Sequence, residues 1–166
     1  MVIGVITGKT LDEFFVDIGC AQKAKLDFLR FEGATKRNKP DLKVGELVYA
    51  QVTVSNKDIE PEISCVNSKG KSAGFGVLKG GNLLNCSLSL SRSLLSRESV
   101  VLKCLGNRYP YEIAVGITGR VWINSNSNLT TFIISNVILH SEFLNQSQIN
   151  QLIEKFVQES TKNASF

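Results

Sequence analysis

The sequence has few of the residues that build metal or redox sites. It contains one histidine and four cysteines, and no two cysteines form a C-x-x-C pair. Zinc sites and thiol redox pairs need such ligands at short spacing. We therefore expect no metal and no cofactor, and we interpret the cysteines as reduced, mostly buried residues of an intracellular protein. His140 has no catalytic partner at motif spacing, so a structural or exposed role is expected, and we predict no enzymatic activity.

Long hydrophobic runs are also missing. No apolar segment approaches the roughly 18 residues of a membrane helix, so no membrane partner is expected. No basic-then-apolar signal peptide opens the chain. Hydrophobic residues still make up 43% of the sequence, which is enough for packed cores. The net charge of +4 is a mild basic bias that permits nucleic-acid binding but does not establish it.

The first part of the chain shows the period of two that is typical of β-strands. The expected strands are Val2–Thr7, Glu13–Gly19, Gln22–Phe28, Leu47–Val54 and Glu60–Val66. Five short strands separated by turn residues favour a small closed barrel, because closure removes exposed sheet edges. We predict a five-stranded barrel of the S1-type OB fold over residues 1–70.

Alternation also assigns side chains to the two faces of the predicted barrel. Phe14 and Phe28 fall on the inward face and are expected in the core. Phe15 and Tyr49 fall on the outer face, where aromatic rings of such barrels stack on bases of single-stranded RNA. Phe15 could equally be covered by a second domain or a partner, and Tyr49 could merely finish a strand at the rim.

The stretch Phe28–Pro40, FLRFEGATKRNKP, carries three cations within four residues: Lys36, Arg37 and Lys39. Together with Lys23 and Lys25 they are the candidate phosphate contacts of the barrel, because lysine and arginine supply the electrostatic part of RNA binding. Two other interpretations stay open. The loop could be an ordinary solvated surface, or it could contact a neighbouring protein.

A glycine-rich segment, residues 68–81, follows the barrel, and we expect a tight crossover with several residues at positive φ. The elements expected after it are strand Leu83–Leu88, helices Ser89–Leu95 and Glu98–Leu105, strands Tyr111–Val115 and Arg120–Asn124, helix Leu129–Leu144, and a last helix around Ile149–Val157. This order predicts a type I KH-like α/β domain over residues 77–166 with extra C-terminal helices, so the whole chain is α+β. Asn145 and Gln148 resemble a capping box for the last helix.

The predicted KH domain lacks the loop that grips nucleic acid. A functional KH domain clamps four nucleotides with a GXXG loop between its first two helices. The corresponding connection here, Leu95-Ser96-Arg97-Glu98, contains no glycine. The G-x-x-G of this chain, Gly116–Gly119, lies between two strands and is expected to be a structural turn. We interpret the domain as a packing module in which Trp122 fills an interdomain or partner interface.

Five segments together resemble a known family: FLRFEGATKRNKP, VGELVYAQV, NKDIEPEISC, GVLKGGNLL and YPYEIAVGITGRVWI. They are similar to the eukaryotic RNA exosome cap subunit called ribosomal RNA-processing protein forty, over about Val2 to Phe156. The resemblance implies a non-catalytic protein that sits with other cap subunits on a ring of RNase PH-like subunits and guides single-stranded RNA into its channel. It also implies a nuclear, nucleolar and cytoplasmic location, and a further β domain before the segment matched here.

The resemblance also covers the turn of the KH-like domain. The family carries a structural G-x-N-G turn, matched here by Gly116, Ile117, Thr118 and Gly119, with Thr118 in place of asparagine. Two other functions stay open. The chain could be a fragment of a phosphorolytic exoribonuclease, although those enzymes place KH before S1. It could also be a transcription or translation factor, although such factors usually keep GXXG.

Overall fold

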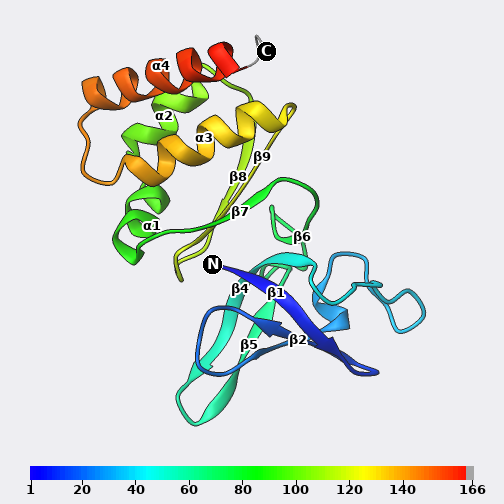
Figure 1. Cartoon of the computed structure of the whole chain (residues 1–166). Coiled ribbons are helices and arrows are strands. Elements are labelled where there is room, and N and C mark those ends of the chain that lie inside the picture. Colours follow the sequence, from blue (N-terminus) through cyan, green and yellow to red (C-terminus); the bar gives the residue numbers. More distant parts are fainter. Residues whose placement is uncertain (164–166) are drawn as a thin grey trace. The chain divides into compact units, whose positions relative to one another are not determined.

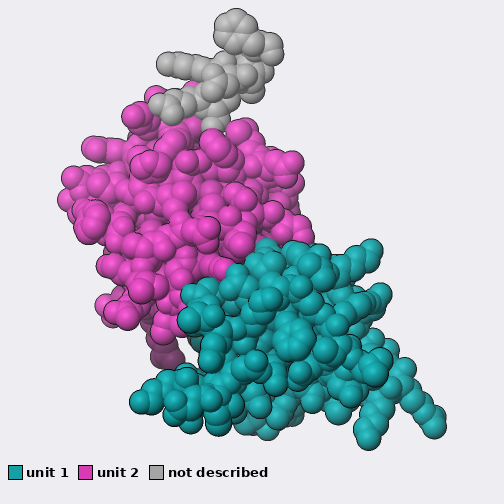
Figure 2. Space-filling model, turned by 60° about the horizontal axis from the view of Figure 1, so that its bottom comes forward, with its two compact units in different colours: residues 1–79 teal, residues 80–166 magenta. Residues whose placement is uncertain are grey.

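The structure is a computed structural model that describes residues 1–163, with side chains up to residue 158. The chain forms two compact units, residues 1–79 and residues 80–166 (Figures 1 and 2). Each unit has its own apolar core.

The first unit is a closed β-barrel. Its elements are β1 (Val2–Lys9), β2 (Glu13–Asp17), β3 (Ala24–Asp27), the short 3-10 helix η1 (Phe28–Arg30), β4 (Leu47–Asn56), β5 (Ile59–Ser64) and β6 (Gly76–Leu78). The strand order is β1-β2-β3-β5-β4, and β4 pairs back with β1 to close the ring. The β3–β5 pair is parallel and the other pairs of the ring are antiparallel. The predicted five-stranded barrel is therefore confirmed.

Alternate residues of the strands fill the barrel. Phe14 and Leu26 are fully buried, and the Phe14 ring meets the Phe28 ring edge-on at 4.4 Å between centroids. The inward assignment of Phe14 and Phe28 is thus correct. Alternation in the sequence predicts an inward row on β4 of Val48, Ala50, Val52 and Val54. Only Val48 and Ala50 are buried, because Val52 is 36% exposed and the β4–β5 register shifts between Val52 and Val54.

The glycine-rich segment does more than connect the units. Five of its glycines and Ala73 have positive φ, as expected for a tight crossover. It also contains β6, a strand that the sequence analysis did not predict. β6 pairs with Leu47–Tyr49 of β4, the residues whose other edge pairs with β1. Val77 and Leu78, which we had assigned to the second domain, therefore belong to the first unit.

The second unit is a three-stranded sheet with helices. Its elements are β7 (Asn82–Asn85), α1 (Leu88–Leu95), α2 (Val100–Gly106), β8 (Tyr111–Val115), β9 (Arg120–Ser125), α3 (Asn128–His140) and α4 (Gln146–Asn163). The antiparallel sheet has the order β7-β9-β8, and the helices gather on one side of it (Figure 1). The β-α-α-β-β-α order confirms the predicted KH-like domain, and α4 is an additional C-terminal helix.

The core of this unit lies between the sheet and the helices. Val121 and Ile123 of β9 are fully buried in one apolar cluster with residues of α3, and α4 packs against α2 and α3. Apolar spacing in the sequence predicts a buried side of α3 formed by Leu129, Phe132, Ile133, Val137 and Leu144. Ile133 and Val137 are buried as predicted, but the rest of the assignment is partly wrong. Leu129 and Phe132 are 48% and 58% exposed, whereas the buried residues include Ile134. The expected buried stripe on α2 is Val100, Val101 and Cys104. Val101 and Cys104 are buried as predicted, whereas Val100 is exposed and Leu105 is buried as well.

The sequence predicts two local features: a capping box in the second unit, and reduced, mostly buried cysteines in the chain as a whole. Asn145 and Gln148 form the predicted capping box, because each side chain accepts a hydrogen bond from the other residue's backbone N–H, at 2.9 and 3.0 Å. The expectation for the cysteines holds in part. All four are free, but only Cys65 and Cys104 are buried, while Cys20 is exposed. Within the described part of the chain, no helix is long and apolar enough to cross a membrane.

Candidate nucleic-acid interface

The basic loop between β3 and β4 contains a tight turn at Thr35–Asn38. Thr35 and Asn38 exchange both backbone hydrogen bonds, each at 3.1 Å, and the Thr35 hydroxyl also accepts from the Asn38 N–H. Lys36 and Arg37 occupy the two central positions of this turn, and both are exposed. Among the described residues, no carboxylate forms an ion pair with either cation. The turn therefore presents two uncompensated positive charges at the tip of the loop.

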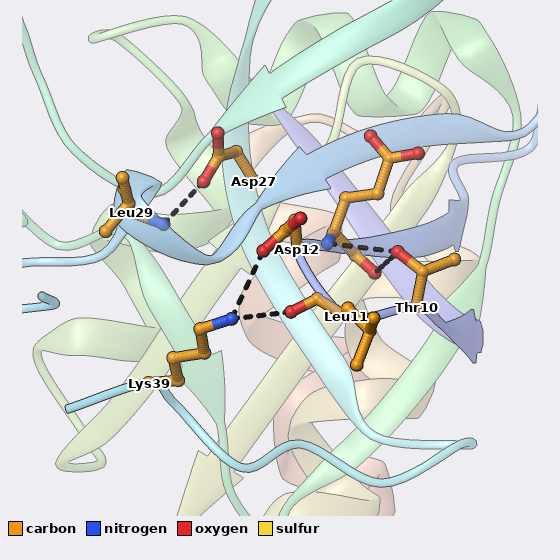
Figure 3. Close-up of polar contacts among 7 residues, drawn as sticks. Thr10, Leu11, Asp12, Asp27, Leu29 and Lys39 are labelled. Carbon is orange, nitrogen blue, oxygen red and sulfur yellow. Dashed lines mark hydrogen bonds and ion pairs between the residues drawn. The ribbon is translucent and has the colours of Figure 1, made fainter. Parts of the chain in front are cut away.

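Lys39, one residue after this turn, is held against the barrel (Figure 3). Its Nζ donates to the backbone oxygen of Leu11 at 2.6 Å and contacts a carboxylate oxygen of Asp12 at 3.2 Å. The same Nζ lies 5.1 Å from the centroid of the Phe28 ring, within the range of a cation–π contact. The charge of Lys39 is thus already offset by protein groups, unlike the charges of Lys36 and Arg37.

The start of the loop is fastened as well. The Glu32 carboxylate accepts a hydrogen bond from the Ser72 N–H at 2.8 Å and pairs with Lys71 at 3.3 Å. The hydrogen bond from Ser72 is the main cause that lowers the pKa of Glu32 from the ordinary 4.5 to about 2, and Lys71 adds to it. Glu32 therefore ties the loop to the glycine-rich segment.

Because Glu32 makes these contacts as a carboxylate, the stability of the barrel should depend on pH. Because the pKa of Glu32 is lowered in the folded chain, its contribution to stability is complete above pH 4.5 and is lost as the pH falls toward 2. Glu32→Gln should make the barrel less stable than the parent at neutral pH, and the difference should shrink over that range. Urea unfolding of both proteins at several pH values measures this difference in the free energy of unfolding. A difference that stays constant with pH would contradict the prediction.

An open cavity of about 420 Å³ is bounded by the basic loop, the short helix η1 and the β1–β2 turn. It is lined by Asp12, Asp27, Phe28, Leu29, Lys36 and Lys39. The Asp27 carboxylate accepts the Leu29 N–H at 2.7 Å and so fixes the short helix η1 beside this cavity (Figure 3). Two of the predicted cations, Lys36 and Lys39, are therefore brought together.

The outer face of β2 and β3 carries two more of the predicted residues. Phe15 is half-buried and lies opposite Lys25 on β3. Lys25 pairs with Glu60 at 2.7 Å, and this contact is the main cause that raises its pKa, with Glu13 and Glu62 adding to it. Acidic groups thus surround Lys25, so this face is electrostatically less suited to phosphate than the loop tip.

The remaining predicted residues of the barrel, Lys23 and Tyr49, belong to other parts of the chain than the basic loop. Lys23 is exposed just before β3. Tyr49 is half-buried on β4, and its ring lies 5.4 Å from the Phe75 ring between centroids. Its hydroxyl donates to the Met1 sulfur at 3.2 Å. Tyr49 is therefore already packed against another aromatic ring, and the sequence analysis did not foresee Phe75 as its neighbour.

In the second unit, the predicted turn joins β8 to β9. Gly119 has φ +86°, and its carbonyl accepts the Cys86 N–H at 2.8 Å. The Gly116 carbonyl accepts a hydrogen bond of 2.6 Å from the buried Ser91 hydroxyl. Both glycines are buried, so their backbone groups are used inside the domain. Ile117 in the turn is 49% exposed.

Trp122 and the connection between α1 and α2 are the other predicted features of the second unit. Trp122 is 5% exposed, and its indole N–H donates to the Gly80 carbonyl at 2.8 Å. The connection between α1 and α2 is Ser96-Arg97-Glu98-Ser99, so the first two helices are joined without glycine, as expected. An RNA clamp of the GXXG kind is therefore missing at that position.

Asp12 and Glu32 were not predicted as parts of the interface. Asp12 meets Lys39 across 27 residues of sequence, and Glu32 meets Ser72 across 40. No local pattern could have identified such pairs, because they exist only once the barrel has closed. Among the described residues no group of three or more His, Cys, Asp or Glu side chains could hold a metal ion.

The fold defines a class of protein, in which an S1-type barrel is followed by a KH-like domain, both modules known for RNA binding. A family model described as exosome complex component RRP40, S1 domain, matches residues 1–76, and a KH domain model matches residues 81–129. The chain belongs to the RRP40 family of exosome components. The family resemblance seen in the sequence motifs is thereby confirmed.

Similar proteins from several eukaryotes support this family assignment. The chain is 53% identical over 155 residues to a Dictyostelium discoideum protein named for exosome complex component rrp40, covering 93% of this chain and 65% of that protein. It is 40% and 39% identical to exosome complex component RRP40 of Bos taurus and Homo sapiens, in each case covering 95% of this chain and 58% of the relative. The chain thus spans about 58 to 65% of the length of these relatives.

A solved structure shares the fold of the whole chain. The crystal structure of an exosome complex RNA-binding protein superposes with a TM-score of 0.77, covering 96% of this chain and 94% of the other. The sequence identity between the two is 22%, so this likeness concerns the fold alone.

Proposed function

We propose that the barrel binds single-stranded RNA through the tip of the basic loop, and that the chain acts as a non-catalytic cap subunit of the RNA exosome. In this role it guides RNA toward a ring of RNase PH-like subunits, beside other cap subunits. The observation that carries the RNA-binding part is the turn Thr35–Asn38, which presents Lys36 and Arg37 exposed and without an ion pair in the described chain. Membership of the RRP40 family supports the exosome part.

The other predicted residues have smaller roles in this proposal. Lys23 is an exposed cation just before β3, and we assign it no main contact. Lys25 is paired with Glu60, and the Tyr49 ring is packed on Phe75, so we assign neither as a main contact. Phe15 stays a candidate for stacking on one base. We propose nuclear, nucleolar and cytoplasmic residence on the basis of the family alone.

Salt dependence tests the RNA-binding part. The slope of log affinity against log salt is about −0.7 for each phosphate neutralised on a single strand. Lys36→Gln with Arg37→Gln should therefore make the slope for a labelled oligouridylate shallower by about 1.4. Fluorescence anisotropy at several salt concentrations measures it.

The matched control changes the same number of charges in the other unit. Lys103→Gln with Lys155→Gln lowers the net charge equally, at exposed positions of α2 and α4. This variant should keep the parental slope. If the loop variant and the parent have equal slopes of log affinity against log salt, Lys36 and Arg37 do not contact phosphate, and the loop is an ordinary solvated surface. Phosphate-dependent degradation of poly(A) by the purified chain would instead favour an enzyme.

A further inference from the structure

The three cations of the basic loop do not occupy equivalent environments. Lys36 and Arg37 lie at the centre of the turn, whereas Lys39 lies at its base and contacts the turn between β1 and β2. The side chain of Lys39 is 39% exposed, although it belongs to a surface loop. Two of its three N–H donors are directed at Leu11 and Asp12 (Figure 3).

The acceptors of Lys39 sit on a rigid support. In the β1–β2 turn, the Thr10 N–H donates to the Glu13 carbonyl at 2.8 Å, and the Glu13 N–H donates to the Thr10 hydroxyl at 3.2 Å. The carbonyl of Asp12 accepts the Phe28 N–H at 3.1 Å, which ties this turn to the end of β3. Leu11 and Asp12 are therefore held in place before the loop meets them.

We propose that Lys39 is a positioning residue, which fastens the base of the basic loop to the β1–β2 turn so that Lys36 and Arg37 alone face phosphate. Asp12 offsets the charge of Lys39, so displacing a counterion there adds little to RNA binding. Together with Glu32 at the other end, Lys39 limits the motion of the turn and lowers the entropy lost on binding. The inference rests on the proposed function where it concerns RNA, but the fastening itself does not need RNA.

The first part of the test is made without RNA. Heteronuclear NOE values of the backbone amides of residues 33–39 report motion of the loop on the picosecond to nanosecond timescale. Lys39→Gln and Asp12→Asn should both lower these values. Lys36→Gln should leave them unchanged, and Lys39→Arg, which keeps a charged donor, should preserve them. Unchanged values in both Lys39→Gln and Asp12→Asn would overturn the inference, whether or not the chain binds RNA.

The second part uses the labelled oligouridylate. Lys36→Gln and Arg37→Gln should each reduce the salt slope by about 0.7. Lys39→Gln should keep the parental slope while the affinity falls about twofold to fivefold, the scale of one exposed ion pair. A slope for Lys39→Gln reduced as much as that for Lys36→Gln would make Lys39 a phosphate contact and overturn the inference. If no protein in the series binds RNA, the proposed function fails, and the NOE values still decide whether Lys39 fastens the loop.

Discussion

Phe14→Ala should lower the free energy of unfolding of the barrel by about 3–5 kcal/mol, the usual cost of removing a buried phenylalanine ring. Phe14 is 0% exposed and meets Phe28 and Phe31 edge-on, at 4.4 and 6.4 Å between ring centroids. Neighbouring strands close around it, so the space left by the ring cannot readily refill. Since small domains have only about 5–15 kcal/mol of stability, this loss is large enough to leave part of the population unfolded.

Hydrogen exchange of the β1–β5 amides measures the effect of Phe14→Ala on the barrel. Phe15→Ala is the matched control, because it removes the same ring from the next residue, which faces outward and is half-buried. Phe15→Ala should lower the free energy of unfolding clearly less than Phe14→Ala does. Fluorescence of Trp122, the one tryptophan of the sequence, follows the second unit separately in the same samples. Equal losses for the two variants would contradict the assignment of Phe14 to the barrel core.

Gly119→Ala should strongly destabilise the second unit. Gly119 has φ +86°, and a Cβ built there would lie 2.6 Å from the Cys86 backbone oxygen. Backbone strain alone costs roughly 1–3 kcal/mol at such a position. The overlap adds to this cost, because it displaces a carbonyl at the end of β7 rather than a flexible side chain. The hydrogen bond from the Cys86 N–H to the Gly119 carbonyl would be disturbed as well.

Urea unfolding followed by Trp122 fluorescence tests this prediction. Gly80→Ala is the matched control in the same unit. Gly80 also has positive φ, +67°, but nothing lies within 4 Å of a Cβ added there. Gly80→Ala should therefore lower the free energy of unfolding only by the cost of backbone strain. If the two alanine variants unfold at the same urea concentration, the close approach of Gly119 to Cys86 contributes nothing to stability.

Most of the fold could be predicted from the sequence, because the barrel strands alternate and the last helix begins with a capping box. The capping box of Asn145 and Gln148 is a case in which two side chains close in sequence determine a local structure. β6 was missed because glycines surround its three residues, and its pairing with β4 depends on the closed barrel. The buried side of α3 was misassigned because both sides of that helix carry large apolar residues, such as Phe132 and Ile134.

The candidate interface could be predicted only in part. The loop cations are visible in the sequence, and their positions at the tip and base of a turn follow from the local pairing of Thr35 with Asn38. Which cations are free to meet a ligand depends on acids that are distant in sequence. Asp12 offsets Lys39, and Glu60 offsets Lys25. The number of cations in a basic loop therefore overstates the charge that the loop presents to RNA.

Closure of the barrel also affects how the chain can self-associate. β1 and β4 pair with each other, so the five strands of the ring leave no open edge and the three-residue β6 is the one edge strand described in the first unit, whereas β7 and β8 of the second unit each pair with β9 alone among the described strands. Exposed strand edges are where misfolded chains join into aggregates. Intermolecular strand pairing on heating or crowding therefore starts more readily from the second unit. Glu112, the second residue of β8, is exposed, so its carboxylate places a charge on that edge and opposes the process.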